Sequence, residues 1–178
     1  MRNPSKKVRQ TKSNKKLKHV HFSAIIIFKL VIPADKRDRQ SKNRLVKALF
    51  NSGVSESILA KAKADKLPVK KTKQERQWST VTGVLTTNTK TATSFSFPEL
   101  HANKRINQSL HVVGINIDRY DMIIGRDLIR SLGIDIHGDT MTIHWDNSTI
   151  SWRNIDSTQT IHLRYCNKMH CSILKPRE

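Results

Sequence analysis

The stretch "ALFNSGVSES", residues 48–57, is the starting point for predicting the fold and the chemistry of the chain. Its apolar start, residues 48–50, is typical of a buried strand. The strand leads directly into Asn51, Ser52 and Gly53. These three residue types are also common in ordinary turns, so the tripeptide alone predicts either a turn or a polar site at a strand end. The rest of the chain has to decide between the two interpretations.

Two apolar strands are predicted around this stretch. The Ile- and Val-rich residues 23–32 and the run "RLVKALF", 44–50, indicate strands that return beside each other across a polar turn region. After Gly53, "SILAKAKADKL" (57–67) has apolar residues at roughly helical spacing. We expect one or two helical turns there, ending before Pro68.

The middle and end of the chain predict further strands. The Thr-rich residues 77–97 indicate a hairpin with Gly83 at its tip or in a bulge, and Asn88 marks a possible further turn. Another strand is expected at 108–115. Residues 120–136 predict a short strand that breaks at Gly125, and then a helix that Gly133 ends. Residues 141–152 predict a final hairpin. The fold class is therefore mainly β, a barrel with one or two short helices.

Positive charge dominates the composition. Lys and Arg number 33 against 14 Asp and Glu, a formal net charge of +19. Residues 1–19 hold eight of these cations and no acid, which is typical of a disordered basic arm. Such an arm can solubilise the chain, bind nucleic acid non-specifically, or act as a nuclear address. We therefore expect a basic arm at 1–19, a folded domain at 20–152 and a polar tail at 153–178.

The order of the motifs resembles the retropepsin-like aspartic proteases, especially those of gypsy-type LTR retrotransposons. The resemblance rests on "ALFNSGVSESIL", on the hairpin "WSTVTGVLTT" and on "IIGRDLI", and it covers about residues 23–152. It implies an acid-protease barrel that works as a homodimer on a peptide or polyprotein substrate, without a cofactor. Each chain of such a dimer supplies one catalytic loop, here Asn51, Ser52 and Gly53.

The resemblance also implies roles for residues outside the catalytic loop. It assigns Trp78, Gly83 and Ser55 to substrate binding, with Gly83 in a flap that closes over a peptide. It assigns Gly125, Arg126 and Asp127 to structural support, with Arg126 bracing the catalytic loop. Trp78 and Gly83 could equally be core and hairpin residues, and Arg126 an exposed residue at a helix start.

Asn51 stands where the family carries its catalytic aspartate. An amide donates and accepts hydrogen bonds, but it has no basic site that can take a proton from water near neutral pH. We therefore predict an inactive or strongly impaired endopeptidase. The alternative is a non-catalytic module that binds a peptide in the dimeric groove or nucleic acid through the basic arm.

The cysteines, histidines and apolar runs indicate where in the cell the protein resides and whether it binds a metal or spans a membrane. Cys166 and Cys171 cannot form a disulfide framework, which favours an intracellular, cytoplasmic or nuclear protein over a secreted one. Residues 22–33 are too short to span a bilayer and include Lys29, so we expect no membrane segment. His162 and His170 lie near the cysteines, but the spacing does not match a zinc finger, and we expect no metal.

Overall fold

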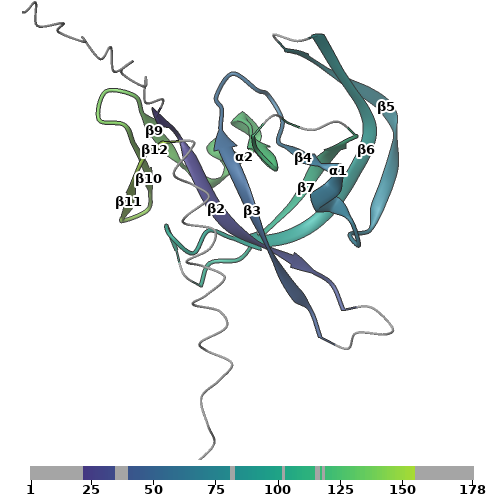
Figure 1. Cartoon of the computed structure of the whole chain (residues 1–178), viewed down its shortest axis with the longest axis horizontal. Coiled ribbons are helices and arrows are strands. Elements are labelled where there is room, and N and C mark those ends of the chain that lie inside the picture. Colours follow the sequence, from purple (N-terminus) through teal and green to yellow (C-terminus); the bar gives the residue numbers. More distant parts are fainter. Residues whose placement is uncertain are drawn as a thin grey trace, which may run out of the picture.

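The computed structural model describes residues 22–34, 40–80, 83–101, 103–114, 117 and 119–154. These ranges contain twelve strands and two short helices (Figure 1). In chain order the elements are β1 (Phe22–Ser23), β2 (Ile25–Ile32), β3 (Lys42–Phe50), β4 (Ile58–Ala60), α1 (Lys61–Ala64), β5 (Val69–Thr80), β6 (Gly83–Ser96), β7 (Ile106–Val113), β8 (Met122–Ile124), α2 (Arg126–Leu132), β9 (Asp135–His137), β10 (Thr142–Trp145), β11 (Ser148–Ser151) and β12 (Arg153–Asn154).

Seven of the strands form one sheet that closes on itself. Their order is β2-β3-β8-β4-β7-β6-β5, and β2 also pairs with β6. The second pairing closes all of them except β5 into a barrel, as the sequence predicted. In the described residues β5 pairs with β6 alone, so the β5–β6 hairpin reaches beyond the barrel on one side (Figure 1). The small sheet β11-β10-β9 lies on the opposite side.

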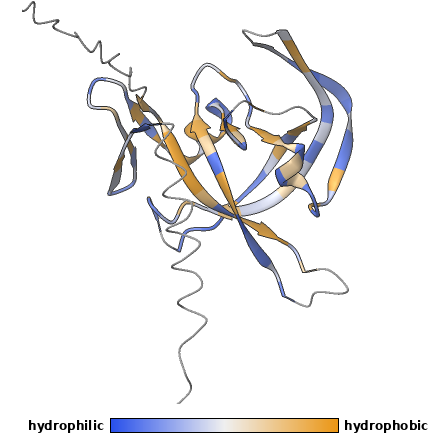
Figure 2. Ribbon diagram, in the orientation of Figure 1, coloured by the Kyte–Doolittle hydropathy of each residue, from blue (hydrophilic) through white to orange (hydrophobic). Residues whose placement is uncertain are grey.

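A single large apolar core holds the barrel together. Strand β2, "IIIFKLVI", is buried at six of its eight positions and is orange in Figure 2, whereas the outer strand β5 is mostly blue. Continuous apolar runs of this kind are expected where both faces of a strand are covered. Trp145, 1% exposed, joins the small sheet to the core, and its indole Nε1 donates to the carbonyl oxygen of Leu132 at 2.7 Å. The small sheet is therefore packed onto the barrel rather than independent of it.

The strand–turn–helix segment at 120–136 has the predicted form. Strand β8 ends at Ile124, Gly125 separates it from α2, and Gly133 ends α2 with a left-handed φ of 66°. The predicted final hairpin is also present, with β10 and β11 paired from Thr142 to Ser151. The pairing of β2 with β3 confirms the two strands predicted around residues 23–32 and 44–50.

Three local predictions were wrong. Ile58 and Leu59 lie in β4 rather than in a helix, because Leu59 pairs with β7 on one side and with β8 on the other. The single helical turn α1 follows only after them. The flap hairpin begins at Val69, well before Trp78. Asn88 lies inside β6 without a turn, opposite a shift in register of β5 between Lys71 and Arg76.

The ends of the described region meet each other. Strands β1 and β12 pair antiparallel, with Phe22 opposite Asn154, so regular pairing continues two residues past 152. The basic arm predicted at 1–19 lies outside the described residues, as does the tail from residue 155 onward with His162, Cys166, His170 and Cys171. None of the helices within the described ranges has the length and apolar character that crossing a membrane requires.

Candidate active site

The loop after β3 is a tight turn organised by the side chain of Asn51. The backbone N–H of Asn51 donates to the carbonyl oxygen of Ile124 at 2.9 Å, which fixes the loop to the end of β8. The amide oxygen Oδ1 of Asn51 accepts the backbone N–H of Gly53 at 2.9 Å. Asn51 is half-buried, whereas Ser52 and Gly53 are exposed. The tripeptide is therefore both a turn and a polar group presented at a strand end.

The geometry of this turn accommodates a carboxylate as well as an amide. One oxygen of an aspartate could accept the Gly53 N–H as Oδ1 of Asn51 does, because both groups are planar and similar in size. The second oxygen would then occupy the position of the amide nitrogen. Gly53 also keeps the turn compact, since a Cβ on it would lie 3.1 Å from Oδ1 of Asn51.

Gly125 allows the loop and the β8–α2 junction to touch. A Cβ on Gly125 would lie 2.8 Å from the carbonyl carbon of Glu56 and 3.0 Å from the carbonyl oxygen of Val54. These are backbone atoms, which cannot rotate away as a flexible side chain can. At this distance the N–H of Arg126 donates to the carbonyl oxygen of Val54 at 2.8 Å. The absence of a side chain at residue 125 thus permits the two segments to bond directly.

Asp127 and Ser57 complete the junction with side chains. The carboxylate of Asp127 accepts the Ser57 hydroxyl at 2.7 Å and the Ser57 backbone N–H at 3.1 Å. The same hydroxyl oxygen accepts the N–H of Gly125 at 3.0 Å, and Ser57 is 1% exposed. Because Ser57 is buried, Asp127 is half-buried and each of these groups has a partner, the network holds the loop in one position relative to β8. Sequence reasoning had not identified Ser57, whose burial depends on segments about seventy residues away.

The residues predicted to support the loop divide into two kinds. Gly125 and Asp127 make the contacts just described, which agree with a supporting role. The side chain of Arg126 is exposed, and Arg126 contacts the loop through its backbone N–H. Bracing by the Arg126 guanidinium therefore stays a prediction.

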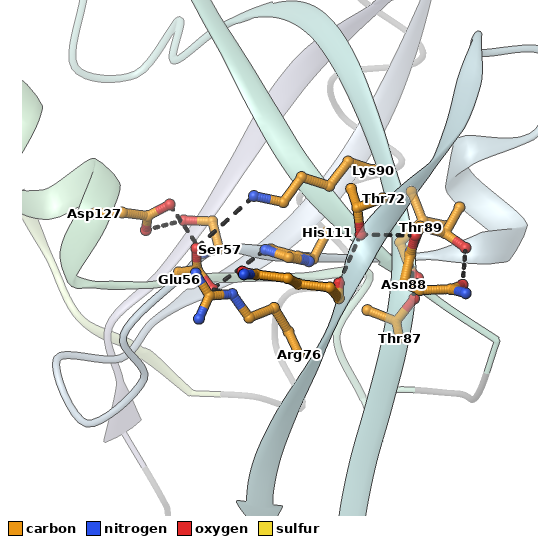
Figure 3. A network of polar contacts seen from close by, with 12 residues as sticks. Glu56, Ser57, Thr72, Arg76, Thr87, Asn88, Thr89, Lys90, His111 and Asp127 are labelled. Carbon is orange, nitrogen blue, oxygen red and sulfur yellow. Dashed lines mark hydrogen bonds and ion pairs between the residues drawn. The ribbon is translucent and has the colours of Figure 1, made fainter.

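Glu56 connects the loop to the flap hairpin. Its carboxylate lies 3.3 Å from Nε of Arg76 on β5, 3.8 Å from Nζ of Lys90 on β6 and 3.2 Å from Nε2 of His111 on β7 (Figure 3). His111 is 2% exposed, and burial lowers its pKa below the ordinary value of 6.5. The positive charge of Lys90 lowers the pKa of His111 further, although Glu56 opposes both effects. Sequence reasoning missed this cluster, because its members lie on four separate segments.

A small apolar cluster lies beside the Glu56 contacts. It consists of Ile58, Trp78, Leu85 and Val113, with Val54 and Ile117 packed against it. The Trp78 and His111 rings meet edge to face with centroids 5.1 Å apart. The Trp78 side chain therefore packs between the flap and the loop, and its role in substrate binding stays a prediction. Ser55 is exposed near the loop, and Gly83, with a φ of 135°, begins β6.

The chemistry available to one chain follows from these contacts. The loop presents one amide, from Asn51, and no titratable group at the same position. Asp121 and Asp127, the aspartates on either side of β8, are engaged elsewhere. Asp121 accepts the backbone N–H of Lys47 at 2.9 Å and lies 3.3 Å from Nζ of Lys63. Neither aspartate is positioned to replace a carboxylate at residue 51.

Comparison with known proteins shows that the chain is similar to retroviral aspartyl proteases. The family model described as retroviral aspartyl protease matches residues 25–137. Among solved structures, the chain is similar to the retroviral protease-like domain of Ddi1 from Leishmania major, with 16% identity, a TM-score of 0.46, and coverage of 74% of this chain and 97% of that chain. It is also similar to EIAV protease in complex with the inhibitor HBY-793, with 18% identity, a TM-score of 0.36, and coverage of 68% and 95%. No curated protein matches the chain.

Proposed function

Because the chain belongs to the retroviral aspartyl protease family, we propose that it is a retropepsin-like endopeptidase domain in which Asn51 has replaced the catalytic aspartate. The domain pairs with a second copy and binds a peptide between the two loops and flaps, but cleaves it poorly or not at all. The order of the motifs further supports an origin in the polyprotein of a gypsy-type retrotransposon. The observation that carries the proposal is the position of Asn51 at the end of β3, fixed to β8 and closed onto Gly53.

The reaction of the family explains why this residue matters. Two aspartates, one from each chain, share a single proton because two like charges so close together cannot both ionise. The ionised carboxylate takes a proton from water while the protonated one donates to the scissile carbonyl group. No covalent intermediate forms. The rate therefore depends on one group that accepts a proton and one that donates it.

With Asn51 in both chains, neither role can be filled. An amide oxygen is a hydrogen-bond acceptor but not a base near neutral pH, and the amide nitrogen does not give up its proton. General acid–base catalysis contributes about 10²–10⁴-fold to a rate, and here both partners are absent. The amides can still form hydrogen bonds to a bound peptide. We therefore infer a domain that retains the peptide groove without efficient hydrolysis.

Peptide cleavage by the wild type and by Asn51→Asp tests this proposal, with the oligomeric state of both proteins measured by sedimentation equilibrium. A dimeric Asn51→Asp that cleaves, beside a dimeric wild type that does not, is the expected pair of results. A strictly monomeric chain at high protein concentration would exclude the two-chain site, whatever the activity.

The basic arm supports a second candidate function, non-specific nucleic-acid binding. Residues 1–19 carry eight Lys and Arg and no acidic residue. Binding of this kind releases counterions, so the affinity of the full chain for single-stranded nucleic acid should fall steeply with salt. Reversing charge at Lys15 and Lys16 should weaken binding and flatten that dependence. Binding that does not respond to salt would rule the arm out.

A further inference from the structure

Two lysines of the flap hairpin and a histidine of β7 lie in one row across the sheet. In the antiparallel pairing of β5 with β6, Lys70 is directly opposite Lys90, and in the pairing of β6 with β7, Lys90 is directly opposite His111. Residues directly opposite each other share a face, so these three side chains lie in one row. Two like charges in such positions destabilise a sheet. Lys70 and Lys90 therefore repel each other unless an anion lies near them.

Glu56 supplies one negative charge to this row. Its carboxylate contacts Lys90 and Arg76, two cations whose side chains remain 31% and 52% exposed. His111, buried and with a lowered pKa, is neutral near pH 7 and adds no charge. The single carboxylate of Glu56 is thus shared by Lys90 and Arg76, while Lys70 lies opposite Lys90 on the same face. The charge balance on this face is positive, and partly exposed ammonium and guanidinium groups remain available to a second anion.

The row lies next to the loop that bears Asn51. Glu56 belongs to the segment that follows Gly53, and in Figure 3 Lys90, Arg76 and His111 converge on its carboxylate from the flap side. Trp78 of the flap belongs to the apolar cluster beside it, and Val54 of the loop packs against that cluster. A peptide held between loop and flap would therefore have this positive face within reach of its side chains.

We propose that Lys70, Lys90 and Arg76 form a subsite for an acidic side chain, Asp or Glu, of the peptide that the groove binds. This inference rests on the proposed function, because it assumes that a peptide lies between the loop and the flap. A carboxylate of the peptide would separate the opposed ammonium groups of Lys70 and Lys90. It would also accept hydrogen bonds from the terminal N–H groups of the Arg76 guanidinium, whose Nε lies near Glu56.

Protection of a sheet edge is the competing explanation for these lysines. Strand β5 is the outer strand of the sheet, and lysines on such strands discourage pairing with other chains. That explanation makes no distinction between the two faces of β5. Lys71, the next residue, is opposite Thr89 and so points to the other face, where Val69 and Thr89 line an open cavity of about 800 Å³. Lys70 and Lys71 thus form a matched pair, both exposed, with equal charge and opposite faces.

The test is equilibrium binding of labelled peptides to the full chain, which is feasible because the wild type is expected not to cleave them. The probes are fluorescein-labelled nonapeptides of Ala, Val and Phe that carry one Glu, scanned along the sequence, each compared with the same peptide carrying Gln. The wild type should prefer Glu by about fivefold at one or two positions, the scale of a partly exposed ion pair. Lys70→Gln should weaken this preference, whereas Lys71→Gln and Lys70→Arg should leave it unchanged.

Three other outcomes would overturn the acidic subsite. Equal binding of Glu and Gln peptides at every position overturns the acidic subsite and leaves the peptide groove intact. Equal loss of preference in Lys70→Gln and Lys71→Gln shows a general charge effect and also overturns the subsite. Failure of every peptide to bind the folded wild type overturns both the subsite and the proposed groove. Circular dichroism of each variant confirms that the fold is unchanged.

Discussion

Replacement of Gly125 by Ala should destabilise the domain strongly, because the new methyl group has no space. Its carbon would lie 2.8 Å and 2.9 Å from the carbonyl carbon and oxygen of Glu56, and 3.0 Å from the carbonyl oxygen of Val54. Overpacking of this kind costs about 1–3 kcal/mol. Relief of the clash would stretch the hydrogen bonds that the N–H groups of Arg126 and Asp127 make to the loop, at about 1 kcal/mol each. The expected loss in the free energy of unfolding is about 3 kcal/mol.

Urea unfolding of the full chain, followed by tryptophan fluorescence, measures this loss. With a dependence on urea of about 2 kcal/mol/M, the unfolding midpoint should fall by about 1.5 M. Gly138→Ala is the matched control, because a Cβ there meets no atom within 4 Å and the φ of Gly138 is not left-handed. The control should change stability by less than about 0.5 kcal/mol. Equal midpoints for the two variants would refute the close contact at Gly125.

Two further predictions concern the polar groups around the loop. Ser57→Ala leaves the buried N–H of Gly125 and one oxygen of the Asp127 carboxylate without their partner, so urea unfolding should show that the free energy of unfolding falls by about 2–4 kcal/mol. The control Ser55→Ala changes an exposed residue and should lower the free energy of unfolding by less than about 0.5 kcal/mol. Similar losses for the two variants would contradict the network around Ser57. The pKa of His111 is lowered in the folded chain by burial, so below its ordinary value of 6.5 the unfolded chain binds more protons at this residue, and stability should rise with pH through that window. His111→Phe should remove this part of the pH dependence, and an unchanged slope of stability against pH would show that His111 does not titrate as described.

The sequence was informative where a local motif carries its own geometry. Two motifs can be identified from neighbouring residues alone. One is a buried strand that leads into Asn51 and Gly53, and the other is an apolar pair followed by Gly125 and Asp127. The structure then brings the two motifs into direct contact through parallel pairing of β3 and β8. The parallel pairing itself could not be predicted from a turn motif, because parallel strands are joined by long connections rather than by a short hairpin turn.

The errors arose where tertiary contacts override local pattern. Ile58 and Leu59 fit helical spacing, yet burial between two neighbouring strands makes them β4. The first half of β5 has no apolar alternation because it is exposed on both faces, so the flap strand was placed too late. Glu56 and His111 interact across segments that no local rule connects. Only the folded chain shows which polar residues meet.

The rate of peptide cleavage by Asn51→Asp and by the wild type, at equal concentrations of folded dimer, tests whether Asn51 is what prevents hydrolysis. We expect Asn51→Asp to cleave at least about a hundredfold faster, because it restores both the proton acceptor and the proton donor. Its activity should show two apparent pKa values, those of a carboxylate pair sharing one proton. A wild type that cleaves as fast as Asn51→Asp, or a folded dimer of Asn51→Asp that cleaves nothing, would show that Asn51 is not what prevents hydrolysis.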